Sequence, residues 1–488
     1  MNSEQQVFAS RYNFWFETEE GVVLYNANSG AVNLLLASDA RRLGKVLCSW
    51  PMAIPKSALP QEVYEDLVKG GFLLRQDEDE LEVIRKRYQD ARQLSPIVLT
   101  ITTTMDCNLG CYYCYESRTK ERLAVEDVPS LVKFAQNRLD SSPNSNPSLH
   151  VDWYGGEPLL NVEFMEAASE ALQRFCRKNN YRYAASVISN GTCWPDNVEA
   201  FVRDHAIQQV QVSFDGLKAN HDKRRRYRKE FDSSAGKSSF DQAIRLVDQL
   251  LEVTHVDLRF NADQGNREDL IPFVRFAKAS GWFERPYPAV LQPARLASYS
   301  EKSSFMRAHE LTLEEFDLLR AQVREEVGED TKVEESEAPD GFPYPRASVC
   351  AALASNSMVI GADAKLYQCG LQVGEADRAV GTLPPSDKNS LPIVEPQQDE
   401  GWWNSFDPTV QPKCSVCSFL PICWSGCPKK HLEQDEHAIA EQGRYWRANL
   451  ARLVTKKTGY TLKGHAEVSE SMQFRGGESP PAKSKCPK

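Results

Sequence analysis

The sequence predicts an α/β fold whose centre is a partial (β/α)6 barrel. Between residues 97 and 292, short apolar segments of strand length alternate with longer amphipathic segments of helix length. Repeated β/α units place their strands in parallel, and six of them make an open barrel. The expected strands cover residues 97–104, 149–154, 184–189, 208–214, 255–261 and 287–292. In barrels of this kind the reactive groups lie on loops at the carboxyl ends of the strands.

Smaller domains are expected on both sides of the barrel. Residues 1–92 are expected to form an α+β domain: strand-like FWFETEE and GVVLYNA, then an amphipathic helix and a second helix that ends on glycine. The expected order of the whole chain is this domain (1–92), the barrel (95–300), a helix and linker (301–346), a cysteine-rich domain (347–460) and a disordered tail (461–488).

The composition predicts a globular, cytoplasmic protein. The chain has 488 residues, of which 41% are hydrophobic, enough to bury a substantial core. The amino terminus has no apolar stretch of secretory type, and no segment is long and apolar enough to cross a bilayer. The net charge of −10 gives no general attraction to nucleic acid or to anionic membranes, so neither is expected as a partner.

Thirteen cysteines, most of them in two tight groups, favour metal ligation over disulfides in a reducing compartment. Three isolated cysteines, Cys48, Cys176 and Cys193, are expected to be small buried hydrophobic residues.

The first group is a loop directly after the first expected strand. Cys107, Cys111 and Cys114 have the spacing C-x3-C-x2-C. Three thiolates can hold three irons of a [4Fe–4S] cluster and leave the fourth iron open to another ligand. A structural zinc site normally has four ligands, and the loop contains no fourth cysteine or histidine, so zinc and coincidence are the weaker alternatives.

This loop at the end of the first strand of a partial barrel resembles the signature of the radical S-adenosylmethionine (radical SAM) superfamily. The resemblance implies that the open iron binds S-adenosylmethionine, and that reduction of the cluster cleaves the cofactor to methionine and a 5′-deoxyadenosyl radical. The radical would abstract a hydrogen atom from substrate. Tyr113, just before the third cysteine, matches the aromatic residue that the family places near the adenine.

Short polar motifs end the next three expected strands, at the edge that also holds the cysteine loop. YGGEP ends the second strand, SNG the third and SFDG the fourth. They resemble family segments that bind the ammonium group of the cofactor and reach its ribose or carboxylate. The residues implied are Gly155, Gly156, Glu157, Ser189, Asn190, Ser213 and Asp215. Taken alone, each motif is also typical of an ordinary turn.

A basic run, HDKRRRYRKEF, begins at His221. It resembles the family pattern HD-x-x-R, whose arginine faces the cofactor carboxylate, and the matching residue is Arg225. For Arg226, Arg228 and Lys229 the expectation is a solvated loop face.

The second cysteine group has the spacing C-x2-C-x5-C-x3-C at Cys414, Cys417, Cys423 and Cys427. By itself this spacing also suits a zinc knuckle. Together with Cys350 and Cys369 upstream, it resembles the SPASM extension, which binds one or two auxiliary [4Fe–4S] clusters in enzymes that modify peptides and proteins. The resemblance assigns Cys350, Cys369 and Cys427 to one cluster and Cys414, Cys417 and Cys423 to the other.

The sequence departs from the SPASM pattern at two places. Ala364 stands where a glycine is usual, and the seventh cysteine downstream of Cys427 is missing. The second auxiliary cluster therefore needs another ligand or is altered or absent. The candidate ligands are Asp435, His431, His437 and a folded-back Cys486.

The expected substrate is a ribosomally synthesised precursor peptide that the enzyme modifies oxidatively, by a crosslink, a thioether, epimerisation or a similar change. The amino-terminal domain resembles the winged-helix-like domain with which peptide maturases bind a leader peptide as an added strand, although it could equally cap the barrel. A low-potential flavodoxin or ferredoxin would supply electrons. The alternatives are a maturase of an intact protein, such as a sulfatase or a quinone-bearing subunit, and a non-catalytic zinc-stabilised peptide-binding module. No catalytic acid or base can be named from the sequence.

Overall fold

The computed structural model describes residues 6–47, 53–75, 78–144, 146–231, 238–298, 301–328, 342–384 and 398–464. The chain forms two compact units. One comprises Met1–Arg92, Ser336–Cys350 and Ser405–Lys488, and the other comprises Gln93–Glu335 and Ala351–Asn404. The segment 347–460, expected as one cysteine-rich domain, is therefore divided between the units. Cys48, Cys486 and residues 465–488 of the expected tail lie outside the described residues.

The larger unit is built on a parallel sheet, which confirms the fold class predicted for the barrel. Its six strands are β7 (Ile97–Thr102), β8 (Ser148–Tyr154), β9 (Arg182–Ser189), β10 (Ile207–Phe214), β11 (His255–Ala262) and β12 (Val290–Arg295). Each strand pairs in parallel with the next one along the chain. The carboxyl ends of all six strands consequently lie at the same edge of the sheet.

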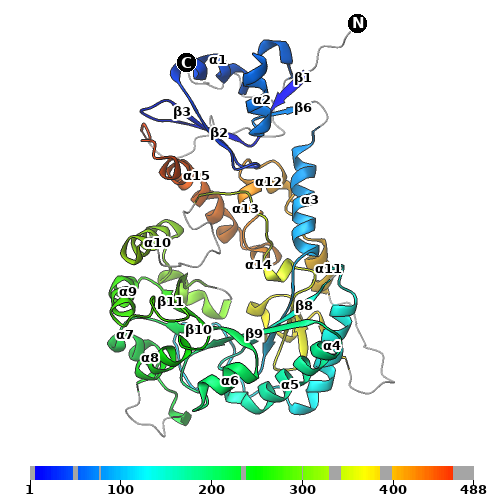
Figure 1. Cartoon of the computed structure of the whole chain (residues 1–488), viewed down its shortest axis with the longest axis vertical. Coiled ribbons are helices and arrows are strands. Elements are labelled where there is room, and N and C mark those ends of the chain that lie inside the picture. The colour runs from blue at the N-terminus through cyan, green and yellow to red at the C-terminus, as the bar shows by residue number, and fades with distance from the viewer. Residues whose placement is uncertain are drawn as a thin grey trace. The chain divides into compact units, whose positions relative to one another are not determined.

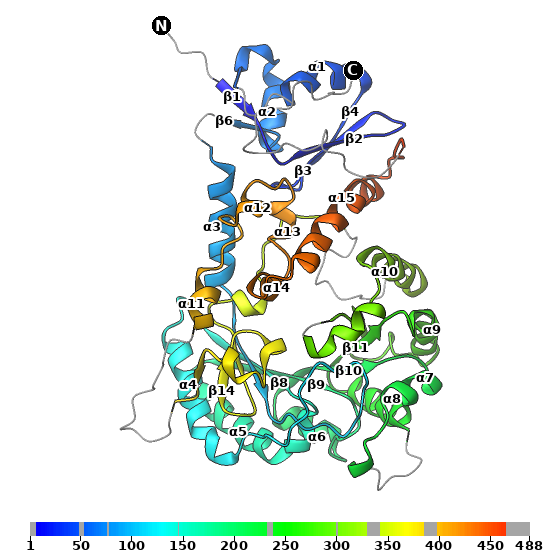
Figure 2. The same cartoon turned by 180° about the vertical axis from the view of Figure 1, so that it is seen from behind.

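Helices connect the strands and lie around the outside of the sheet (Figures 1 and 2). They are α4 (Val128–Asp140), α5 (Val162–Lys178), α6 (Val198–Asp204), α7 (Lys218–Arg224), α8 (Ser239–Leu250) and α9 (Leu270–Ala279). The packing of α5 follows from its sequence, because Phe164, Ala168, Leu172 and Cys176 recur every four residues and are buried. Cys176 is thus the buried hydrophobic residue that was expected.

The two faces of the sheet differ in polarity. Leu149, Val151 and Trp153 on β8 are fully buried, while the alternating positions on the opposite face carry polar side chains, as at Asp152 and Tyr154. The corresponding face of β10 and β11 carries Gln209, Gln211, Ser213, Asp257, Arg259 and Asn261. A closed (β/α)8 barrel fills its interior with branched apolar residues. This polar interior instead suits a polar ligand.

Three short strands, which the sequence did not predict, extend the sheet beyond β7. They are β13 (Met358–Ile360), β14 (Lys365–Tyr367) and β15 (Gly381–Thr382). β13 pairs in parallel with β7, and the two later strands add in antiparallel fashion. Part of the cysteine-rich region is therefore continuous with the barrel sheet.

Ala364 lies in the turn between β13 and β14 with a φ of 59°. This left-handed conformation costs a non-glycine residue about 1–2 kcal/mol of strain, which glycine would relieve. Glycine also has a greater entropy in the unfolded state, and this offsets about half of the stability gained from relieving the strain. We expect Ala364→Gly to raise stability by about 0.5–1 kcal/mol. The measurement is the melting temperature of the whole chain. Ala362→Gly, a buried neighbour without a positive φ, is the matched control and should not stabilise. Equal effects of the two substitutions would contradict the argument.

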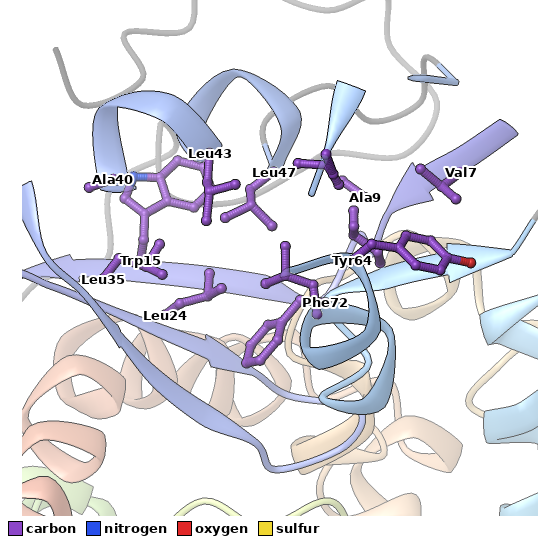
Figure 3. Packing of buried hydrophobic residues seen from close by; sticks show 13 residues of the cluster. Val7, Ala9, Trp15, Leu24, Leu35, Ala40, Leu43, Leu47, Tyr64 and Phe72 are labelled. Carbon is purple, nitrogen blue, oxygen red and sulfur yellow. The ribbon is translucent and has the colours of Figure 1, made fainter. Parts of the chain in front are cut away.

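The smaller unit begins with two three-stranded antiparallel sheets and three helices. The sheets contain β1 (Gln6–Ala9), β5 (Ile54–Pro55) and β6 (Leu73–Arg75), and β2 (Asn13–Glu17), β3 (Val22–Asn26) and β4 (Val32–Leu35). The helices are α1 (Ala37–Leu47), α2 (Gln61–Lys69) and α3 (Glu80–Gln93). Figure 3 shows its apolar core, in which Trp15 and Leu24 from the second sheet meet Leu43 and Leu47 from α1.

The remaining helices are α10 (Leu313–Val327), α11 (Gln398–Ser405), α12 (Pro412–Ser415), α13 (Leu420–Cys423), α14 (Pro428–Leu432) and α15 (Glu436–Thr458). Thr312 and Glu315 form a capping box at the start of α10. None of the helices in the described part of the chain is both long and apolar enough to cross a membrane.

Candidate functional site

A cavity of about 350 Å³ lies at the carboxyl ends of the strands of the larger unit. Its wall contains most of the residues that the sequence assigned to the site: Cys107, Cys111, Tyr113, Cys114, Gly155, Gly156, Ser189, Asn190, Ser213 and Arg225. Glu157 and Asp215 are not in the wall. The structure therefore gathers residues of five separate sequence motifs around one space, as expected for loops at one edge of a parallel sheet.

The three thiols of the first group share this wall. The loop is held in place by backbone hydrogen bonds to the basic segment after α7, from the Gly110 N–H to the Arg226 carbonyl (2.8 Å) and from the Arg228 N–H to the Asn108 carbonyl (2.9 Å). Burial raises the pKa of the thiols, that of Cys114 to about 11. They are therefore expected to ionise when a cation binds them.

The donor set fits an iron–sulfur cluster. Within the described parts of the chain, no three His, Cys, Asp or Glu side chains are arranged to hold a metal ion. Three thiolates can hold three irons of a [4Fe–4S] cluster, and the three thiols of the loop line one cavity, so their chemistry fits such a cluster.

Gly155 and Gly156 allow the turn after β8 to lie against the cysteine loop. A Cβ atom on Gly155 would lie 2.4 Å from the Thr104 carbonyl oxygen, and one on Gly156 would lie 2.5 Å from that of Asp106. The Gly156 N–H donates to the Thr104 carbonyl (3.0 Å). The glycines are needed because two backbone segments touch here, which also leaves bare backbone in the cavity wall.

Glu157 joins the ends of β8 and β9. Its fully buried carboxylate accepts hydrogen bonds from the Ser189 hydroxyl (2.9 Å), the Asn190 N–H (2.7 Å) and the Leu159 N–H (3.3 Å). The glutamate thus positions two cavity residues. Its expected contact with a cofactor ammonium group stays a prediction.

Burial raises the pKa of Glu157 to about 7. Because the folded-state value exceeds the unfolded one, the folded chain holds the proton more tightly, and stability falls as pH rises between about 4.5 and 7. Glu157→Gln lacks this titration. We expect the free energy of unfolding of the wild type, relative to that of this variant, to fall by about 1–3 kcal/mol as pH rises from 5 to 7.5. The melting temperatures of the two proteins, compared at each pH, measure this change. A pH-independent difference would contradict the assignment.

Asp215 is the centre of a buried charge network. It is fully buried, accepts a hydrogen bond from the Tyr113 hydroxyl (2.8 Å), and forms ion pairs with Arg224 (3.2 Å) and Arg225 (3.4 Å). Arg224 also pairs with Asp263 (2.9 Å). Arg225 additionally donates to the Tyr113 hydroxyl (2.7 Å). Asp215 therefore holds Tyr113 and Arg225 in the cavity wall.

Arg225 retains an unused donor. Its Nε is buried and has no hydrogen-bond partner among the described residues. A buried guanidinium N–H without an acceptor is costly, so an anionic group in the cavity would stabilise it. This atom fits the carboxylate contact that the sequence implies for Arg225.

One expectation for the basic run differs from the structure. Arg228 was expected on a solvated face, but it forms an ion pair with Asp106 and donates to the Cys107 carbonyl (2.7 Å). Cys193 was expected to be an inert buried residue, but its sulfur accepts from the Asn108 amide (3.1 Å), beside the first cysteine. Both side chains support the cysteine loop.

Sequence reasoning missed several residues of the cavity wall. They are Leu109, Tyr115, Glu116, Arg118, Tyr154, Ile188, Gln211, Arg259, Asn261 and Leu296. Several of them occupy inward positions near the carboxyl ends of β8, β9, β10 and β11. Successive side chains of a strand point to opposite faces of the sheet, so the polar residues that alternate with the buried apolar ones lie on the inward face. This alternation is the sequence signal that identifies them.

The second cysteine group lies in the smaller unit. The Ser425 hydroxyl donates to the sulfur of Cys414 (3.0 Å), and burial raises the pKa of Cys423 to about 12. Trp424, Ser425 and Gly426 have successive φ values of 45°, 67° and 70°. Strained backbone of this kind collects at ligand sites.

The ligands that would complete the auxiliary clusters stay predictions. Asp435 caps α15 by accepting from the Ala438 N–H (3.1 Å), and the His431 Nε2 hydrogen-bonds the Ser425 carbonyl (2.9 Å). Cys350 and Cys427 are exposed in the smaller unit, whereas Cys369 belongs to the larger one.

Comparison with known proteins gives a match over the barrel. Residues 101–275 match the model of the radical SAM superfamily. The chain is 23% identical to the sporulation killing factor maturation protein SkfB of Bacillus subtilis, over 61% of this chain and 65% of SkfB. It is 24% identical to the mycofactocin maturase MftC of Mycolicibacterium smegmatis, over 38% of this chain and 43% of MftC. The chain thus spans less than two thirds of either relative.

Among solved structures, the chain resembles native anSMEcpe with bound AdoMet, with a TM-score of 0.53 and 19% identity, over 75% of this chain and 100% of that one. At this level of identity the similarity concerns the fold.

Proposed function

Because residues 101–275 are a radical SAM domain, whose family uses a [4Fe–4S] cluster and S-adenosylmethionine, we propose that the chain cleaves this cofactor reductively and modifies a peptide. One observation carries the proposal: three thiols, two glycines and an arginine with a free donor line a single cavity. When bound, the cluster and cofactor supply an organic radical that removes a hydrogen atom from substrate.

The residues of the chain have separate tasks in this proposal. Cys107, Cys111 and Cys114 hold the cluster. The backbone of Gly155 and Gly156 borders the cofactor without the bulk of side chains, and Arg225 binds its carboxylate through the unused Nε. Asp215 fixes the orientation of Arg225, so that the anchor is preformed before the cofactor binds.

The proposed substrate is a ribosomally synthesised precursor peptide, which is modified oxidatively. The names of SkfB and MftC describe a maturation protein and a maturase. In the smaller unit, β4 lies at the edge of the β2–β3–β4 sheet. An unpaired strand edge can accept an extended segment such as a leader peptide by backbone hydrogen bonds. A low-potential flavodoxin or ferredoxin supplies the electron that cleavage consumes.

The test is anaerobic turnover of the reconstituted chain with the peptide encoded beside its gene. The expected products are 5′-deoxyadenosine and a peptide of changed mass. Loss of two hydrogens indicates a crosslink, a thioether or desaturation, and unchanged mass with deuterium uptake indicates epimerisation. A chain that holds zinc alone and releases no 5′-deoxyadenosine would overturn the proposal, in favour of a peptide-binding module without catalysis.

A further inference from the structure

The cavity wall holds two arginines besides Arg225, namely Arg118 and Arg259. Arg259, on β11, lines the cavity together with Gln211 from β10 and Asn261 from β11. In the parallel ladder Arg259 lies opposite Ser213 on one side and Gln292 on the other. All of these side chains belong to the polar face of the sheet, so the guanidinium lies inside the barrel among neutral groups.

Arg259 has neutral partners only. Its Nε donates to the Asn261 side-chain oxygen (3.3 Å) and its Nη1 donates to that of Gln211 (3.5 Å). Among the described residues it forms no ion pair, and its Nη2 has no acceptor. The positive charge is therefore not neutralised by the protein around it.

The other arginines at this site are paired differently. Arg224 and Arg225 form ion pairs with Asp215, and Arg228 forms one with Asp106. Arg118, another arginine of the cavity wall, donates to the Cys111 carbonyl and so supports the cysteine loop. Arg259 differs from all of these arginines, because among the described residues its hydrogen bonds go neither to a carboxylate nor to the cysteine loop.

The acid nearest to Arg259 along the strand does not neutralise it. Asp257 lies two residues earlier on the same face, but its carboxylate accepts a hydrogen bond from the Gln209 amide, and only 5% of the residue is exposed. Asp257 is not part of the cavity wall. Among the described residues, neither Asp257 nor Glu116, an acid of the cavity wall, forms an ion pair with Arg259, so its guanidinium faces the cavity without a carboxylate partner.

We propose that Arg259 binds a carboxylate of the substrate, so that the enzyme selects a peptide with an acidic side chain next to the residue it modifies. A partly buried guanidinium without an anion is unfavourable, and its planar fork matches a carboxylate in bidentate geometry. The inference rests on the proposed function and adds the substrate class to it.

The other possible source of a carboxylate is S-adenosylmethionine itself. Arg225 is better placed for that group, because it donates to the hydroxyl of Tyr113 (2.7 Å), which lies in the cysteine loop between Cys111 and Cys114. Arg259 lies one strand farther along the sheet than the strand that ends in the SFDG motif. We therefore assign the cofactor carboxylate to Arg225 and the substrate carboxylate to Arg259.

The test uses two probe peptides, N-acetyl-Gly-Glu-Gly-amide and N-acetyl-Gly-Gln-Gly-amide, whose binding to the reconstituted enzyme is measured in the presence of S-adenosylmethionine. The wild type should bind the glutamate probe at least about tenfold more tightly, the effect of one charged hydrogen-bonded pair. Arg259→Gln should remove this preference. Arg259→Lys should keep part of it, since lysine retains the charge but not the fork. Arg174→Gln, at an exposed site on α5, is the matched control and should keep all of it.

A parallel measurement separates the two sources of carboxylate. Arg259→Gln should bind S-adenosylmethionine within about twofold of the wild type, because the lost contact is to the peptide. A clear loss of cofactor affinity in this variant would place the cofactor carboxylate at Arg259 and overturn the proposal. Equal binding of the two probes by the wild type, or no detectable binding of the glutamate probe, would also overturn it.

The proposed function is judged by a different readout. Release of 5′-deoxyadenosine by the wild type without peptide reports cofactor cleavage and does not involve Arg259. A chain that cleaves the cofactor but shows no preference between the probes contradicts the inference alone, whereas a chain that does not cleave it contradicts the function. Iron content and melting temperature of Arg259→Gln, expected to equal those of the wild type, exclude misfolding as the cause of a lost preference.

Discussion

Replacement of Cys111 by alanine is expected to abolish the release of 5′-deoxyadenosine and to lower the iron content by about four atoms per chain. Cys111 is buried in the cavity wall between the other two thiols of its loop. Two remaining thiolates cannot hold three corners of a cubane, so the cluster that activates the cofactor is lost. The measurements are iron and sulfide analysis of the anaerobically reconstituted protein and chromatography of the cofactor products.

Cys176→Ala is the matched control for Cys111→Ala. Cys176 is also buried, but it lies on the buried face of α5. Its removal costs little beyond packing, so both iron content and cofactor cleavage should remain at the wild-type level. If Cys111→Ala retained full iron and continued to cleave the cofactor, the assignment of the first cysteine group would be wrong.

Asp215→Ala is expected to destabilise the larger unit by about 3–5 kcal/mol, the usual result of removing one partner from a buried ion pair. Arg224 keeps Asp263 as a partner, but among the described residues the side chain of Arg225 keeps only the Tyr113 hydroxyl. Arg225 is therefore left as a buried charge without a carboxylate. Affinity for S-adenosylmethionine should fall as well, because the guanidinium is no longer held toward the cavity. Melting temperature and equilibrium binding of the cofactor measure the two effects.

Two substitutions bracket this result. Asp215→Asn keeps the shape and one acceptor but removes the charge, so its effects should be intermediate. Asp204→Ala removes an exposed aspartate that pairs with Arg203 on the surface, and it should change stability by less than about 0.5 kcal/mol. If Asp215→Ala had the same melting temperature as the wild type, the charge network around Asp215 would contribute nothing to the stability of the fold.

The sequence predicted the barrel well because its signals are local. The strands have six to eight residues and the helices between them have seven to seventeen, which gives clear periodicities, and the six expected strands correspond to β7–β12. The cysteine loop and the three polar motifs follow their strands directly. Their meeting at one cavity is a consequence of parallel pairing, which brings the carboxyl ends together.

The residues that were missed depend on partners far away in the chain. Asp263 and Arg224 are 39 residues apart in the sequence, and Asp106 and Arg228 are 122 residues apart. No local sequence pattern therefore predicts either ion pair. In the sequence, Arg259 is one polar residue in the alternating pattern of a strand. That its side chain bonds to neutral groups follows only from the residues opposite it on β10. β13 has three residues, too few for a periodicity, and it pairs with a strand about 260 positions earlier.

Because β13 pairs with β7, the barrel cannot be separated from the segment that contains β13 without exposing an edge of its sheet. β7 carries the cysteine loop at its end, and without β13 one side of β7 would present unpaired backbone groups as an open edge. An isolated barrel that ends before residue 351 would therefore expose a template for strand-to-strand aggregation beside the cysteine loop. The cysteine-rich segment is thus not an accessory that can be cut away. It covers one edge of the strand that carries the cysteine loop.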